Sequence, residues 1–157
     1  MTAQSIASRI AARNQSPALD RGALLERVSG RWQLELRAAV QPLDLTPAQF
    51  RLLVATAWLN ASGAATRQSE IAAHANSDAV VTSEVLRTLE ARDLIRREPH
   101  PTDRRAKAIS VTETGAALAD RAMRIVESVE SRFFETGMSE FGVLAKALKK
   151  GGRGKNS

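Results

Sequence analysis

The order of elements expected between residues 66 and 112 constrains the fold more than any other feature of this chain. Apolar residues at helical spacing predict a short helix over residues 67–75 and a second helix over residues 78–92, with a turn between them. Two short segments, 94–98 and 106–111, then predict strands joined by a basic loop. This is the order of elements in a winged helix-turn-helix.

Helix caps are expected at the polar residues that precede these segments. Thr66 is expected to cap the short helix, and Ser77 or Asp78 to cap the second one. Residues 76–78 are expected to form the turn between them.

The second helix has one apolar and one polar face. The side chains expected to point into the core are Thr82, Val85, Leu86 and Leu89. The outward side chains are Val80, Ser83, Glu84 and Arg87. Small side chains near the start, followed by one long donor, suit a helix that enters the major groove of DNA. Taken alone, however, this helix is better explained as an ordinary amphipathic helix with a solvated face, so the neighbouring elements must decide.

The loop between the two predicted strands is more specific evidence for DNA binding than the second helix is. Residues 99–105 are too many and too rich in proline for a two-residue turn. Asp103, Arg104 and Arg105 stand together at its tip, and Lys107 follows on the next strand. A stiff cationic loop of this kind suits phosphate contacts and insertion into a narrow minor groove.

The positive charge of the chain is localised rather than spread over its surface. The net charge is +6, and residues 92–107 hold six Lys or Arg against three acids. A second basic segment, residues 142–157, holds five Lys or Arg and no acid. A localised positive patch is typical of a protein that binds a polyanion, although a basic tail also simply keeps a surface soluble.

Two longer helical segments flank the winged unit. Residues 22–41 place apolar side chains every three or four positions, and Pro42 ends that helix. Residues 46–49 have the pattern of a capping box, which predicts a helix ending near residue 60. The long helix expected from Thr112 onward has little of its own domain to pack on, so it needs the first helix and a second subunit.

The predicted fold class is therefore mainly α with a small β-hairpin wing (α+β), a winged helix-turn-helix with helical dimerisation arms. The expected division is a mobile N-terminal arm over 1–21, a dimerisation region over 22–44 and 112–149, a DNA-binding domain over 45–111 and a disordered basic tail over 150–157.

Composition argues against several other classes of protein. The chain has no Cys, which removes disulfides, thiolate metal sites and thiol redox sensing. It has no apolar run long enough to cross a bilayer and no secretory signal, so a cytoplasmic protein without a membrane partner is expected. His74 and His100 lack partners at metal-ligand spacing, and the glycines near the end lack the spacing of a phosphate-binding loop. We therefore expect neither catalysis nor a metal or cofactor.

Three blocks of sequence resemble the multiple-antibiotic-resistance regulator (MarR) family. They are LTPAQFRLL at 45–53, SEIAAHA at 69–75 and DAVVTSEVLRTLEARDLIRREPHPTDRRAKAISVTETG at 78–115. The resemblance implies a homodimeric repressor or activator whose terminal helices pair. It also implies a recognition helix in the major groove, a wing in the minor groove, and release of DNA by a small, often anionic aromatic ligand.

The resemblance also assigns roles to individual residues. It implies that Arg105 enters the minor groove while Asp103 holds its guanidinium. The candidate DNA-binding residues are Ser69, Val80, Ser83, Glu84, Arg87, Asp103, Arg104, Arg105 and Lys107. One departure from the family pattern is Asp93, where the family usually has Gly. Asp adopts the left-handed conformation more readily than most residues do.

Two questions stay open at this point. A small aromatic effector could bind in a crevice near Trp32, Phe50 and Trp58, but these aromatic residues are better explained as core. The alternative function is a winged-helix protein-interaction module without specific DNA binding, which would have no need for the cationic wing. The sequence does not identify the operator, the effector or the direction of regulation.

Overall fold

A computed structural model describes residues 3–13, 17–63, 65–102 and 106–135 of the chain. Its helices are α1 (Ala3–Arg13), α2 (Pro17–Val40), the 3-10 helix η1 (Gln41–Leu43), α3 (Pro47–Asn60), α4 (Gln68–His74), α5 (Ala79–Ala91) and α6 (Glu113–Phe134). Its strands are β1 (Thr66–Arg67), β2 (Ile95–Pro99) and β3 (Lys107–Val111). All strand pairs are antiparallel, in the order β1-β3-β2. The predicted class, mainly α with a small β wing, is confirmed.

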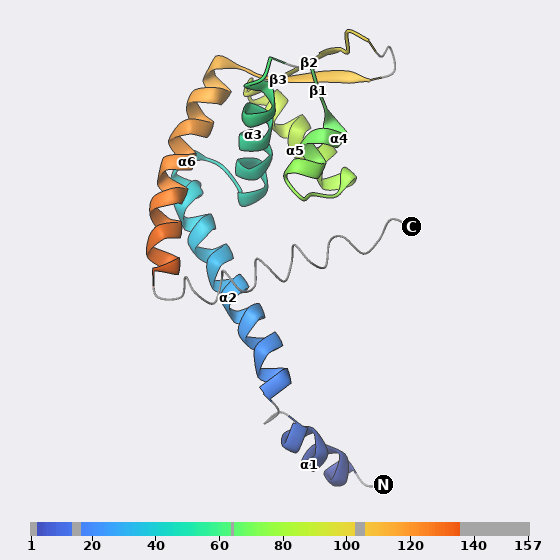
Figure 1. The fold of residues 1–157 in the computed structure, drawn as a ribbon, viewed down its shortest axis with the longest axis vertical. Coiled ribbons are helices and arrows are strands. Elements are labelled where there is room, and N and C mark those ends of the chain that lie inside the picture. Colours follow the sequence, from blue (N-terminus) through green and yellow to red (C-terminus); the bar gives the residue numbers. More distant parts are fainter. Residues whose placement is uncertain (1–2, 14–16, 64, 103–105, 136–157) are drawn as a thin grey trace.

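Helix α3 lies at the centre of the molecule. It packs against α6 on one side and against α4, α5 and β3 on the other (Figure 1). Helices α2 and α6 run antiparallel to each other and extend away from the strands (Figure 1). The chain therefore has a winged unit at one end and a projecting helical pair at the other.

Two clusters of buried side chains match these two parts. The larger cluster fills the winged unit and includes Leu53, Ile71, Leu86, Leu89 and Ile109. The smaller cluster joins α2, α3 and α6 and consists of Leu36, Val40, Leu45, Phe50, Ala122 and Val126. Because α3 contributes to both clusters, its buried residues are not confined to one face; they are Phe50, Leu52, Leu53, Ala55 and Thr56.

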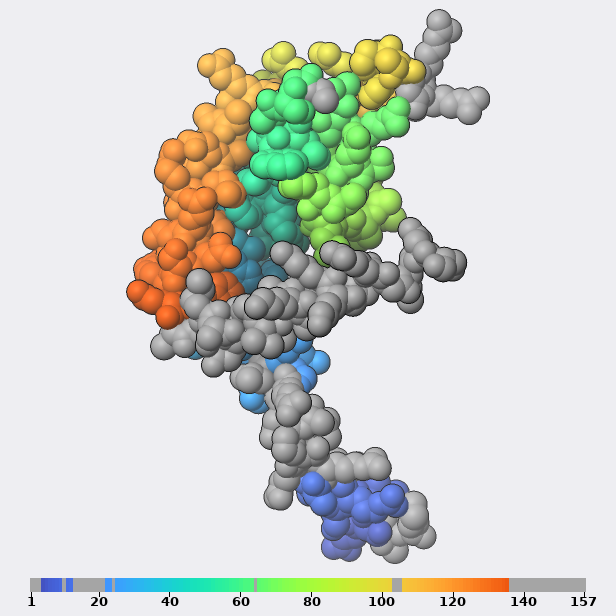
Figure 2. Space-filling view, viewed as in Figure 1, coloured from blue at the N-terminus to red at the C-terminus, as the bar shows by residue number. Residues whose placement is uncertain are grey.

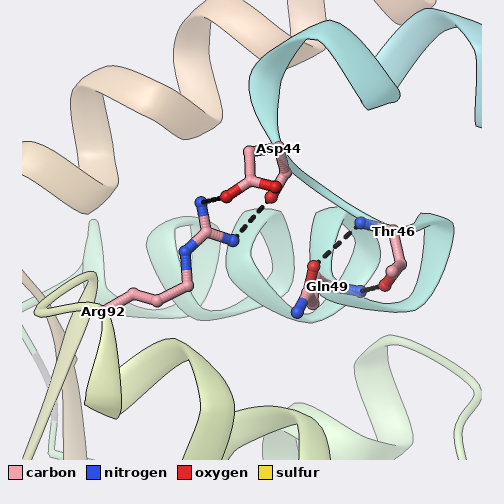
Figure 3. Close-up of polar contacts among 4 residues, drawn as sticks. All are labelled: Asp44, Thr46, Gln49 and Arg92. Carbon is pink, nitrogen blue, oxygen red and sulfur yellow. Dashed lines mark hydrogen bonds and ion pairs between the residues drawn. The ribbon is translucent and has the colours of Figure 1, made fainter.

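The start of α3 has the capping box that the sequence predicted. The Gln49 backbone N–H donates to Thr46 Oγ1 at 3.2 Å, and the Thr46 N–H donates to Gln49 Oε1 at 2.8 Å (Figure 3). Pro47 occupies the first turn, where its missing N–H has no helical partner to lose. These contacts fix where α3 begins relative to η1.

The prediction that Thr66 caps the short helix is wrong. Thr66 lies in strand β1, is buried, and pairs with Ile109 of β3. The residue at the N-cap of α4 is Arg67, whose backbone N–H donates to Glu70 Oε2 at 2.6 Å. Strand β1 was not predicted from the sequence, because a two-residue strand has no periodicity to detect.

The N-terminal segment also differs from the expected arm with at most a turn of helix. Residues Ala3–Arg13 form a helix, and α2 begins at Pro17, earlier than expected. Helix α1 lies at the end of the molecule opposite the strands (Figure 2). The short helix expected near Ser139 and the basic tail lie outside the described residues. No helix within the described ranges is long and apolar enough to cross a membrane.

Candidate nucleic-acid interface

The outward face of α5 carries the predicted recognition residues. Val80 is 69% exposed, Glu84 and Arg87 are exposed, and Ser83 is half-buried. On the opposite face Thr82, Leu86 and Leu89 are buried, as their spacing predicted. The first turns of α5 are thus slim, and Arg87 supplies a long cationic donor one turn later.

Both ends of α5 are fixed by polar contacts. At its start Asp78 Oδ1 accepts from the Val81 N–H at 2.9 Å, which confirms one of the two predicted caps. At its end Arg92 donates to the backbone oxygen of Asp44 at 2.6 Å and pairs with its carboxylate at 3.3 Å (Figure 3). The exposed ion pair contributes little stability by itself, but the contact orients α5 relative to the α2–α3 connection.

The turn after α5 has the backbone conformation that the family resemblance implied for Asp93. Its φ is 54°, in the left-handed region. Thr112 Oγ1 then donates to the Asp93 oxygen at 2.8 Å, and the Thr112 N–H donates to the Leu94 oxygen at 3.1 Å. Thr112 also caps α6 by accepting from the Gly115 N–H at 3.0 Å. One threonine therefore connects the end of α5, the start of β2 and the start of α6.

The wing extends from the sheet over α4 (Figure 1). Lys107 is exposed at the start of β3 and lies opposite Pro99. The predicted wing-tip residues Asp103, Arg104 and Arg105 lie outside the described residues. The two strands on either side of the tip are described, and β3 also pairs with β1, the strand that α4 follows directly.

Ser69 is exposed near the start of α4 and shares a cavity with Lys107. The same cavity is lined by Arg67, Gln68 and Arg97, none of which was among the predicted site residues. A signal for Arg97 was present, because side chains two residues apart on a strand share a face and Ile95 is buried.

The aromatic side chains do not form the crevice suggested by the sequence. Trp58 is 64% exposed and stacks on His74 with ring centroids 4.4 Å apart. Phe50 is buried, and Trp32 lies against Phe133 and Phe134 at 5.4 and 5.5 Å. Trp58 therefore contacts the end of α4 and stays largely exposed.

The two histidines have local roles in the structure. The His74 ring stacks on Trp58, and the His100 ring accepts from the Thr102 N–H at 3.4 Å. Within the described ranges, no group of three or more His, Asp or Glu side chains is arranged to hold a metal ion.

This arrangement matches known proteins in sequence and in fold. The model of the MarR family matches residues 45–107. The HTH-type transcriptional regulator YdcH of Bacillus subtilis is 33% identical over 138 residues, which are 88% of this chain and 91% of that protein. The HTH-type transcriptional repressor Rv2887 of Mycobacterium tuberculosis is 32% identical and covers 71% of this chain and 77% of its own length.

The chain belongs to the MarR family. As a member, it is a transcriptional regulator, and the family is not a class of enzymes. The structure of CouR from Rhodococcus jostii RHA1 bound to p-coumaroyl-CoA has a TM-score of 0.75 and 27% identity, and covers 91% of this chain and 99% of that one. CouR bound to a 23-mer DNA duplex has a TM-score of 0.70 and 30% identity, and the match covers 84% of this chain and 92% of the CouR chain.

Proposed function

We propose that this MarR-family regulator is a repressor that binds a pseudo-palindromic DNA site as a homodimer. The observation that carries the proposal is the outward face of α5, where slim exposed side chains precede Arg87 next to a cationic wing. The similarity to the repressor CouR in its DNA-bound structure, at 30% identity, supports the same proposal. A protein-interaction module would not need this combination of a slim helix and basic wing.

The dimer is supported by the apolar surface of the projecting helices. Leu34 is 69% exposed and Leu25 is 55% exposed on α2, although both lie in a helix that packs on α6. Nine residues apart, the two side chains lie on different sides of α2, so each one marks apolar surface that the contact with α6 leaves uncovered. We therefore expect a dimer in sedimentation experiments at micromolar concentration, and Leu34→Glu should shift it toward monomer. A wild-type protein that sediments as a monomer would contradict the proposal.

Base recognition is expected to depend on Arg87 and Arg105. Either Arg→Ala change should weaken specific binding by about 1–3 kcal/mol, and Arg87→Ala should also change the base preference. Fragments selected from genomic DNA by the wild-type protein provide the site, and fluorescence anisotropy measures the affinity. The matched control is Arg31→Ala on α2, which removes the same charge far from α5. Equal DNA affinity of the wild-type protein and the three variants would exclude α5 and the wing as the surface that recognises bases.

Release by a small aromatic effector is part of the same proposal. The cavity that favours it has a volume of about 820 Å³ and lies where α6 meets the end of α5, with Arg92, Arg121 and Arg124 among its lining residues. Its size falls in the range of small-molecule sites. Glu113 and Asp120 also line it, and Asp120 pairs with Arg124, so three arginines against two carboxylates leave a net positive charge that suits an anionic aromatic. The DNA-binding assay, repeated with aromatic acids and their thioesters, tests this part; if none of them releases DNA, the effector proposal is withdrawn.

A further inference from the structure

The side of the wing that faces α4 has an unusual set of side chains. Arg97 on β2 lies opposite Ile109 on β3, and Ile109 is buried. Directly opposed side chains in an antiparallel pair project to the same face, so Arg97 points toward the protein rather than into solvent. Lys107, two residues before Ile109, shares this face.

These side chains line a cavity of about 250 Å³ between the wing and the start of α4. Its polar lining is Arg67, Gln68, Ser69, Arg97 and Lys107, completed by two apolar residues. Three cations, one amide and one hydroxyl thus surround the space, and none of the described residues that line it is a carboxylate. A site of this composition selects a small anion with several acceptor oxygens.

Arg97 is the most important of these residues, because its guanidinium is largely buried and two of its nitrogens donate no hydrogen bond within the described residues. The side chain is only 22% exposed, and its Nε lies 3.2 Å from Glu90 Oε2. Nevertheless, Nε and Nη2 are both buried and have no hydrogen-bond partner among the described residues. The carboxylate is close enough for attraction but lacks hydrogen-bond geometry. Buried donors without acceptors are costly, and the guanidinium fork fits the oxygens of a phosphate.

The position of the cavity identifies the anion. In a DNA duplex, a sugar–phosphate strand separates each major groove from the adjacent minor groove. If α5 lies in the major groove and the wing reaches the minor groove, that strand must pass between them. The cavity is lined by residues of the three strands and of the start of α4, so it lies where the wing meets the helix-turn-helix.

We propose that this cavity binds one backbone phosphate of the strand that runs between the two grooves, with Arg97 as its buried donor. The proposal rests on the proposed DNA-binding function. It assigns Arg97, Arg67 and Gln68 to the interface in addition to Ser69 and Lys107. The contact positions the protein on the duplex and carries no base preference.

A phosphate scan of a bound duplex tests the proposal. The probe is a duplex of about 30 base pairs selected by the wild-type protein, in which single phosphates are replaced one at a time by neutral methylphosphonates. Wild-type protein should lose about tenfold in affinity at one position between the grooves. Arg97→Gln should lose a similar factor on the unmodified duplex, lower the salt slope by about one, and be insensitive to the substitution at that position.

Two control variants separate this role from a purely structural one. Arg96→Gln makes the same change one residue earlier, on the opposite face of β2, and should leave the methylphosphonate profile unchanged. Glu90→Gln removes the ion pair and should preserve or increase affinity. An equal loss in Glu90→Gln and Arg97→Gln would show that the pair matters only for folding and would overturn the proposal.

The remaining outcomes are also decisive. If the wild-type protein binds no duplex, the proposed function fails with the inference. If the wild-type protein binds DNA but Arg97→Gln still loses affinity at the same methylphosphonate position as the wild-type protein does, only the inference fails. Inorganic phosphate serves as the soluble probe in thermal unfolding. Stabilisation by phosphate that depends on Arg97, with duplex binding unchanged in Arg97→Gln, would assign the cavity to a free anion and overturn the proposal.

Discussion

Gly115→Ala is expected to lower the free energy of unfolding by about 3 kcal/mol or more, the upper part of the range for an overpacked site. A Cβ at this position would lie 1.9 Å from the Leu94 carbonyl oxygen and 2.9 Å from its carbon. Both are backbone atoms, so no rotamer change can relieve the clash. Either the start of α6 or the start of β2 must move.

The consequence extends beyond stability because of what meets at Leu94. This residue lies between the end of α5 and the start of β2, and its carbonyl accepts from the Thr112 N–H. A shift there changes the angle between the recognition helix and the wing. We therefore expect any folded fraction of Gly115→Ala to bind DNA more weakly than its stability alone would predict.

Urea unfolding followed by circular dichroism measures the effect at a fixed protein concentration, since a dimer's stability depends on concentration. The matched control is Gly22→Ala in α2, where no atom lies within 4 Å of the added methyl group. That change should raise stability by up to about 1 kcal/mol, because Ala favours a helix interior over Gly. Similar midpoints for the two variants would contradict the close approach at Gly115.

Features that depend on neighbouring residues were predictable from the sequence. The caps at Thr46, Asp78 and Thr112 each involve a side chain and an N–H three residues later, so the local pattern contains the whole interaction. The two faces of α5 were predictable for the same reason, because helical spacing alone separates them. The left-handed Asp93 followed from the family resemblance, because the family usually has Gly at this position.

Features that depend on distant residues were not predictable. Thr66 has the sequence environment of a helix cap, and only its pairing with Ile109 makes it a strand residue. In α6 the buried residues are Gly115, Ala119, Ala122 and Val126, whereas the large side chains of the predicted stripe, such as Leu118, are half-buried. Close packing against α3 and α2 favours small residues, and a count of hydrophobic spacing does not detect that. Arg97 was missed for a related reason, since a charged residue in a short basic strand is expected to be solvated.

The side chain of Asn60 is expected to control the attachment of the wing to α3. Its Nδ2 donates to Thr66 Oγ1 at 2.9 Å and to the Ile109 oxygen at 3.1 Å, and its Oδ1 accepts from the Val111 N–H at 2.7 Å. The amide thus pairs with β3 along the edge that β1 occupies, just past the end of that two-residue strand. A side-chain amide offers one donor and one acceptor side by side, as a strand's peptide groups do.

Asn60→Leu keeps the approximate volume but removes all three bonds, leaving a partly buried N–H and C=O on β3 without partners. We expect the free energy of unfolding to fall by about 1–3 kcal/mol. Hydrogen exchange provides the more specific measurement. The Val111 amide should exchange about tenfold faster or more, whereas the adjacent Ser110 amide, which points to the β2 edge, should change no more than global stability requires.

Ser62→Ala provides the matched control at the same end of α3. Ser62 lies in the turn just after α3, and its hydroxyl donates to the Leu59 oxygen at 3.1 Å, so its loss should change stability by less than about 0.5 kcal/mol and leave Val111 exchange unaltered. Thr66→Val removes one of the three Asn60 contacts and should give an intermediate effect. Because α3 packs against α6 as well as β3, a weakened Asn60 anchor should also reduce DNA affinity while the dimer persists. If Asn60→Leu accelerates Val111 and Ser110 equally, the amide contributes only to general stability and does not position the wing.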